Sequence, residues 1–228
     1  MEPFLKHRGL IVPLDRSNID TDQIIPKQFL KSIARTGFGE HLFQDWRYLP
    51  NGQRNPDFAL NAPRFHGASL LVTRNNFGCG SSREHAVWAI QQYGFRAVIA
   101  PWQQRGAGRV PAFADIFRNN CSKNALLTVE LTEAEVDEIF QMVDRFPGIE
   151  ATVDLEHQRL TLHTAEELAF HFDINSAIKA RLVHGFDDIG LTLKYQDAIA
   201  AFEARHDSQW LSPLTPTTTS PRPTTPHN

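Results

Sequence analysis

Residues 69–100 read SLLVTRNNFGCGSSREHAVWAIQQYGFRAVIA, and their hydrophobic pattern predicts the fold class. Two short apolar runs, at 69–73 and 95–100, are typical of buried strands. Between them, apolar side chains recur at the spacing of one helical face, namely Ala86, Ala89, Ile90 and Tyr93. Gly94 lies where a helix C-terminal cap belongs. This strand–loop–helix–strand unit favours parallel strands joined by a right-handed crossover.

The flanking segments extend the same alternation of strands and helices. Thr132 and Glu135 form a capping box ahead of an amphipathic helix that stops at Pro147. Further strands are expected at 9–14 and 126–129, and a β-hairpin at 151–155 and 160–162. Further helices are expected at 174–182 and at about 196–205. The predicted fold class is therefore α/β.

Composition is that of a globular protein, with 41% hydrophobic and 21% charged residues among 228. The net charge of −3 argues against a dedicated nucleic-acid binder, which would show a basic face. Residues 1–211 are expected to form one folded domain. Ser, Thr or Pro fill 13 of the 17 positions in 212–228, and so little apolar area cannot offset the entropy of ordering. This segment is therefore predicted to be a disordered tail.

The chain has two cysteines, Cys79 and Cys121, too few for a disulfide scaffold or for the thiolates that usually hold an iron–sulfur cluster. No C-x-x-C pair is present, so a structural zinc site is not expected and no metal ligand is assigned. The first eight residues lack the apolar run of a signal peptide, and no apolar stretch approaches membrane-spanning length. We therefore expect a cytoplasmic protein.

The loop before the predicted central helix contains the candidate chemistry. Gly78 and Gly80 let the backbone approach a ligand closely, and Ser81 with Glu84 is expected to form a capping box. A helix N-terminus attracts anions, and Arg83 adds a planar fork that suits a carboxylate or phosphate. The loop matches neither a Walker A motif nor a dinucleotide fingerprint, so a small carboxylate is favoured. On these residues alone, a plain helix cap is the competing interpretation.

Residues 76–86, NFGCGSSREHA, resemble the signature of the swivelling domain of the aconitase superfamily. The resemblance covers about 4–207 and includes the segments 18–26, 35–39, 56–58, 114–117 and 187–193. Together these segments resemble the family of 3-isopropylmalate dehydratase small subunits. The resemblance implies a three-layer β/β/α swivelling domain and a two-chain enzyme. The large subunit of that enzyme carries a [4Fe–4S] cluster, and this chain binds no cofactor itself.

The implied reaction is the hydro-lyase step of leucine biosynthesis that converts 2-isopropylmalate to 3-isopropylmalate through 2-isopropylmaleate. The resemblance also implies that the iron of the large subunit would supply Lewis-acid chemistry at the departing hydroxyl. By the same analogy Ser81 accepts the proton, and Ser82 and Arg83 bind a substrate carboxylate. Two other interpretations stay open, namely a related hydro-lyase for homocitrate or methylmalate-type acids and a non-catalytic anion-binding module.

Further substrate-binding candidates rest on the resemblance. Asp20, Thr21 and Asp22 lie near the active cleft in the family, although local Asx-type hydrogen bonds explain such a polar turn more simply. Arg35 and Thr36 fall within 29–39, which corresponds to the family's substrate-recognition region. Cys79 is assigned to small-residue packing rather than to nucleophilic catalysis, and His85 to a helix surface or a buried partner.

One segment departs from the family pattern. Residues 102–111, WQQRGAGRVP, look like an insertion of about ten residues after a predicted strand. Ligands often bind beyond strand ends in α/β folds, so the insertion is expected to crowd the cleft or the partner interface, or else to form a solvent-exposed loop without effect.

Overall fold

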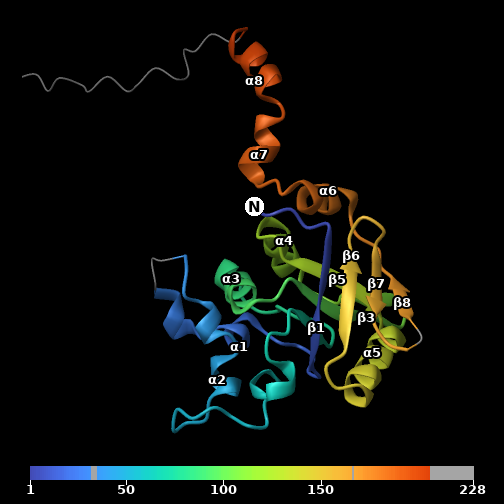
Figure 1. Ribbon diagram of the computed structural model, residues 1–228. Coiled ribbons are helices and arrows are strands. Elements are labelled where there is room, and N and C mark those ends of the chain that lie inside the picture. Colours follow the sequence, from blue (N-terminus) through green and yellow to red (C-terminus); the bar gives the residue numbers. More distant parts are fainter. Residues whose placement is uncertain (32–34, 166, 206–228) are drawn as a thin grey trace, which may run out of the picture. The chain divides into compact units, whose positions relative to one another are not determined.

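The computed structural model describes residues 1–31, 35–165 and 167–205, and the predicted tail at 212–228 lies outside them. The chain divides into two compact units, Met1–Asp188 and Ile189–Asn228. The first unit contains the sheet (Figure 1). Among the described residues, no helix has the length and apolar composition that crossing a membrane requires.

Strands and helices interleave along the chain, which confirms the predicted α/β class. The strands are β1 (Lys6–Leu14), β2 (Leu70–Thr73), β3 (Ala97–Arg105), β4 (Gly108–Val110), β5 (Leu127–Thr132), β6 (Glu150–Asp154), β7 (Arg159–Leu162) and β8 (Leu168–His171). The α-helices are α1 (Thr21–Ile24), α2 (Gln44–Arg47), α3 (Glu84–Tyr93), α4 (Asp115–Lys123), α5 (Glu133–Arg145), α6 (Ser176–His184), α7 (Asp188–Leu193) and α8 (Gln196–Glu203). Short 3-10 helices span Lys27–Lys31, Gly39–His41, Ala59–Asn61 and Pro63–Phe65.

A single sheet runs in the order β4-β3-β2-β1-β6-β7-β8, and β5 pairs with β3. Strands β1, β2, β3 and β5 are parallel, as the crossover unit predicts. Strand β1 joins this part to an antiparallel one, because residues 11–14 pair with β2 whereas residues 6–10 pair with β6. The predicted hairpin is confirmed as the antiparallel pair β6–β7.

The core lies on the parallel strands. All four residues of β2 are buried, as are the first five of β3. Continuous burial is typical of parallel strands that are covered on both faces. Helix α5 packs across β1, β2, β3 and β5, and α3 and α4 lie on the other side of these strands in Figure 1.

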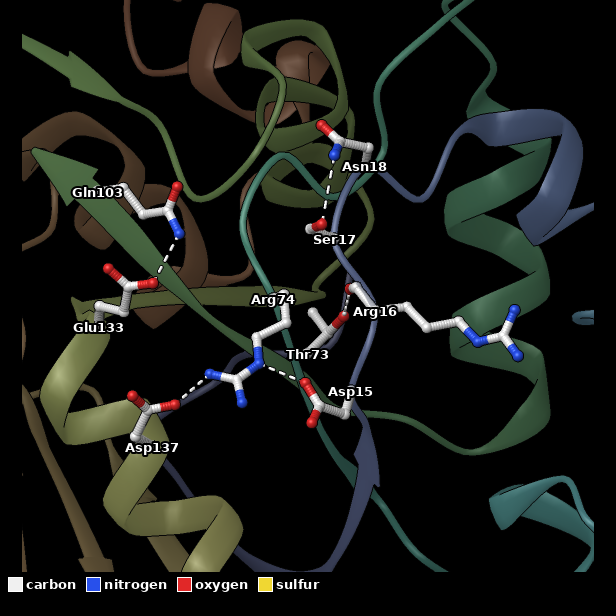
Figure 2. A network of polar contacts seen from close by, with 9 residues as sticks. All are labelled: Asp15, Arg16, Ser17, Asn18, Thr73, Arg74, Gln103, Glu133 and Asp137. Atoms are coloured by element: carbon white, nitrogen blue, oxygen red, sulfur yellow. Dashed lines mark hydrogen bonds and ion pairs between the residues drawn. The ribbon is translucent and has the colours of Figure 1, made fainter. Parts of the chain in front are cut away.

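The carboxyl ends of β1 and β2 are tied to α5 by a polar network (Figure 2). Arg74, directly after β2, donates to Asp15 after β1 and to Asp137 on α5. The hydrogen bond to Asp15 is the main cause that raises the pKa of Arg74. Nearby, Thr73 Oγ1 donates to the carbonyl oxygen of Arg16 at 3.1 Å. The loop that follows β2 therefore starts from a fixed position.

Candidate active site

Three segments that are far apart in the sequence meet beyond the end of β2. Thr21 N donates to Cys79 O at 3.0 Å, and Gly78 N donates to Ile19 O at 2.7 Å. On the other side, Phe77 pairs with Phe113 in an isolated parallel bridge. Backbone hydrogen bonds thus hold the glycine-rich loop between the segment that begins α1 and the segment that precedes α4.

A cavity of about 300 Å³ opens where these segments meet. The cavity is lined by Thr21, Gly78, Gly80, Ser81, Ser82 and Arg83 and, from the start of α4, by residues 114–117. Ser81 and Ser82 are exposed, so their hydroxyl groups are open to a ligand. The structure therefore brings the predicted catalytic residue and both predicted carboxylate-binding residues to one cavity.

The predicted capping box at Ser81 is wrong. Helix α3 begins at Glu84, and Arg83 occupies the N-cap position without any side-chain cap. Glu84 instead accepts a hydrogen bond from Asn124 Nδ2 at 3.0 Å. The physical reason is a tertiary contact, because Thr21 Oγ1 donates to the carbonyl oxygen of Ser81 at 2.7 Å and holds that residue outside the helix.

Two helix N-termini adjoin the cavity, and neither has a side-chain cap. Arg83 is the N-cap of α3 and Ala114 is the N-cap of α4, and both residues line the cavity. Uncapped first-turn N–H groups and the positive end of the helix dipole both attract anions. The sequence pattern indicates the first of these helix ends but not the second, because α4 reaches the loop through tertiary contacts such as the Phe77–Phe113 bridge.

Arg83 is held by Asp22, 61 residues earlier in the sequence. Nη1 of Arg83 donates to Asp22 Oδ1, and Lys27 Nζ lies 3.4 Å from the other carboxylate oxygen. The Arg83 side chain is 12% exposed. Asp22 therefore orients the guanidinium of Arg83. The N–H donors of Arg83 that do not contact Asp22 are available to an anion in the cavity.

The other residues of the predicted polar turn have separate roles. Asp20 is the N-cap of α1 and forms a capping box with Gln23, whose backbone N donates to Asp20 Oδ1 at 2.7 Å. The simpler Asx-type interpretation therefore describes Asp20. Thr21 is buried, lines the cavity and donates to Ser81 O, so it acts on the site through the loop backbone.

Arg35 and Thr36 are exposed and do not line this cavity. The Arg35 guanidinium lies 5.8 Å from the ring centre of Trp88, and Arg35 O accepts a hydrogen bond from Gln92. Residues 32–34 of the same predicted recognition region lie outside the described part of the chain.

Neither cysteine has the environment of a reactive thiolate. Burial, with a contribution from Asp20, raises the pKa of Cys79, and complete burial raises the pKa of Cys121 well above its ordinary value. His85 packs against the rings of Phe38 and Trp88, at 5.2 and 4.9 Å between ring centres. Within the described residues, no group of three or more His, Cys, Asp or Glu side chains could hold a metal ion.

The apparent insertion forms the β3–β4 hairpin, with Gln103 paired to Val110. Its tip is exposed, and its contacts run to β5 and α5, where Arg109 Nη2 donates to Glu130 at 3.0 Å and Gln103 Nε2 donates to Glu133 at 2.8 Å. The hairpin lines a different cavity, of about 700 Å³. None of its residues lines the 300 Å³ cavity that contains Ser81, which we call the Ser81 cavity. This arrangement favours the exposed-loop interpretation over crowding of the cleft.

Shortening this hairpin is expected to leave catalysis unchanged. Because Gln103 and Val110 already pair, residues 104–109 can be replaced by Asn-Gly, which forms a two-residue hairpin turn. We expect kcat and KM of the complete enzyme to stay within about twofold, since exposed loop changes away from a site have small effects. Steady-state kinetics would check this, and a fall in kcat of tenfold or more would show that the hairpin reaches the reaction.

Comparisons with known proteins identify the family of this chain. A family model of the aconitase C-terminal domain matches residues 1–134, and a model of the C-terminal domain of the 3-isopropylmalate dehydratase small subunit matches residues 188–211. The small subunit of 3-isopropylmalate dehydratase from Desulforapulum autotrophicum is 54% identical over 92% of this chain and 98% of that protein. The protein of the same name from Delftia acidovorans is 52% identical over 93% and 97%.

The fold is also similar to a solved structure. The crystal structure of 3-isopropylmalate dehydratase from Methanocaldococcus jannaschii superimposes with a TM-score of 0.60 and covers 87% of this chain and 99% of that chain. At 22% sequence identity, this likeness supports the fold alone.

Proposed function

The chain belongs to the family of 3-isopropylmalate dehydratase small subunits, and we propose how its cavity serves the isomerisation of 2-isopropylmalate to 3-isopropylmalate. As in its relatives, the chain is a hydro-lyase component of leucine biosynthesis, and it acts with a large subunit. The observation on which the proposal rests is the Ser81 cavity, in which two hydroxyls, one oriented guanidinium and two uncapped helix N-termini converge.

Substrate binding is the first task of this cavity. The substrate is a small dicarboxylate, and Arg83 offers its planar fork to one carboxylate while Asp22 holds the guanidinium in place. Ser82 adds a hydroxyl donor from the adjacent position. The N–H groups of the two helix ends add the positive potential that a dianion requires. These groups favour a carboxylate substrate over a neutral one.

Proton transfer is the second task, and we assign it to Ser81. Dehydration removes a proton from the carbon next to a carboxylate. The alkoxide form of Ser81, whose side chain is exposed at the cavity, accepts this proton and becomes the neutral hydroxyl. A serine hydroxyl is a poor base unless its anion is stabilised. Arg83 and the two helix ends supply that stabilisation in a preorganised form. In the rehydration half of the reaction, the Ser81 hydroxyl donates a proton back to carbon.

The residues of this chain do not fit an iron–sulfur cluster. Cys121 is completely buried within α4, and Cys79 is half-buried in the loop with a raised thiol pKa. We therefore assign the [4Fe–4S] cluster to the large subunit. We also expect the complete enzyme to be a heterodimer in the cytoplasm.

Reconstitution with a large subunit tests the function. The chain should be co-expressed with a large subunit from a relative, purified without oxygen and assayed on 2-isopropylmalate, homocitrate and a methylmalate-type acid. We expect formation of 2-isopropylmaleate and 3-isopropylmalate, with the highest kcat/KM for 2-isopropylmalate. A preference for another acid would reassign the substrate. A stable complex without hydro-lyase activity would instead favour a non-catalytic anion-binding subunit.

Asp22 is expected to act as a positioning residue for Arg83. In Asp22→Asn the guanidinium loses its charged partner, so we expect KM to rise by about tenfold, the effect of weakening one charge-assisted hydrogen bond. The effect on kcat should be smaller, because the proton acceptor is untouched. Asp45→Asn, at an exposed position of α2, is the matched control. An equal loss in both variants, or no loss in Asp22→Asn, would contradict this role.

A further inference from the structure

A second cavity lies apart from the Ser81 site. It has a volume of about 520 Å³ and shares no lining residue with the first. Its walls come from α2, from the segment 54–68 and from the end of α3. The polar side chains that line it include Arg47, Arg54 and His66, and none of the described aspartates or glutamates does so.

Arg47 is a buried cation that has no acidic partner in the part of the chain that the structure describes. The residue is 6% exposed, and its Nη1 donates to the carbonyl oxygens of Glu40 and Leu42 at 3.1 and 3.3 Å. Its Nε is enclosed and has no hydrogen-bond partner. Within the described residues, no carboxylate forms an ion pair with this guanidinium. Buried charges in proteins are nearly always paired and fully hydrogen-bonded, and among the described residues Arg47 is neither.

The surroundings of Arg47 favour an anion rather than a neutral ligand. The guanidinium carbon lies 4.8 Å from the ring centre of Tyr93 and 5.4 Å from that of Tyr48. Aromatic ring faces attract the cation but do not neutralise its charge. Arg54 and His66 are exposed and add N–H donors, and no carboxylate among the described residues lines the space. The planar guanidinium of Arg47, with such neighbours, suits the binding of a carboxylate or phosphate group.

We propose that this cavity is a second anion site, in which a small oxyanion, either a carboxylate or a phosphate, binds to Arg47 with help from Arg54 and His66. The apolar part of the lining, from Leu60, Ala62, Pro63 and Ala68, accommodates a short hydrocarbon part when the ligand is a carboxylate. The site is independent of the Ser81 cavity, so it does not depend on the assignment of catalysis.

Binding can be measured on the full chain in the Arg83→Gln background, which weakens anion binding at the first cavity. The probes are inorganic phosphate, acetate and isobutyrate, each compared with chloride at equal ionic strength, by calorimetry and thermal unfolding. We expect saturable binding of about one equivalent and a matching rise in Tm for phosphate or for a carboxylate. Stronger binding of isobutyrate than acetate would identify the carboxylate with an apolar part. Stronger binding of phosphate would identify a phosphate ligand.

The exposed rim residues provide a variant that retains the fold. Arg54→Gln combined with His66→Gln should weaken the affinity by about tenfold, the effect of losing charged donors, and leave the Tm without ligand unchanged. Arg64→Gln is the matched control, because Arg64 is exposed beside Phe65 and does not line the cavity. The proposal is overturned if no probe gives saturable binding beyond chloride, or if the double variant binds as tightly as the control.

Discussion

Replacing Ser81 with alanine is expected to lower kcat of the complete enzyme by about 10²–10⁴-fold, the range for loss of a positioned proton acceptor. The substitution removes one exposed hydroxyl from the cavity and leaves the backbone contact intact, because Thr21 Oγ1 binds the carbonyl oxygen of Ser81. Folding and association with the large subunit should therefore be unchanged. Steady-state kinetics, together with gel filtration of the complex, would measure both quantities.

Ser82→Ala is the matched control for this experiment. Ser82 is the adjacent exposed serine of the same cavity, but its assigned role is carboxylate binding. We expect it to raise KM by about tenfold, as the loss of a hydrogen bond to a charged group does, with a smaller effect on kcat. If Ser81→Ala kept near-normal turnover, or if the two variants exchanged their effects, the assignment of the proton acceptor would be wrong.

Gly78→Ala is expected to destabilise the protein by roughly 2–5 kcal/mol and to abolish most activity. Gly78 has a φ of +74°, and an added Cβ would lie 2.2 Å from Cγ of Phe117. The Phe117 ring cannot move aside easily, because it is 3% exposed and packs 5.3 Å from Phe77, between ring centres. The backbone of the loop must shift instead, and this shift displaces Ser81. Chemical denaturation and kinetics would measure the two effects.

Gly80→Ala measures the cost of the positive φ without the steric clash that an added Cβ meets at Gly78. Gly80 has a similar φ of +85°, but the nearest atom to an added Cβ is Cβ of Asp20, at 3.3 Å. We therefore expect a loss of only about 1–2 kcal/mol, the cost of a left-handed conformation for a residue with a side chain. Equal stability of the Gly78 and Gly80 variants would contradict the proposed contact with Phe117.

Much of the fold could be predicted because its signals are local. Helix α5 begins as its capping box predicts, with Thr132 N donating to Glu135 Oε2 at 2.7 Å. Gly94 is the C-cap of α3, and its φ of +121° explains the glycine. Strand β3 extends beyond the predicted 95–100 to Arg105, because its outer part pairs with β4 and β5. Such partners cannot be recognised from the hydrophobic pattern of one segment.

The site could be predicted in part. The glycines, both serines and Arg83 are contiguous in the sequence, and the structure places them around one cavity. Spacing alone predicts a capping box at Ser81, and the contact from Thr21 overrides it. Arg35 and Thr36 are candidates through the resemblance only, and neither lines the cavity.

The amino-acid sequence by itself determined the α/β class, the crossover unit from β2 to β3 and the loop with its anion-binding residue types. These features depend on periodicity and on neighbours within about four positions, which a linear pattern records. Only the tertiary structure decided that Asp22 holds Arg83, that α4 contributes a second helix end, and that the Nε of buried Arg47 has no hydrogen-bond partner among the described residues. Each of these depends on packing and on hydrogen bonds between distant segments. Such contacts form only when the whole core is assembled, so no local pattern could specify them.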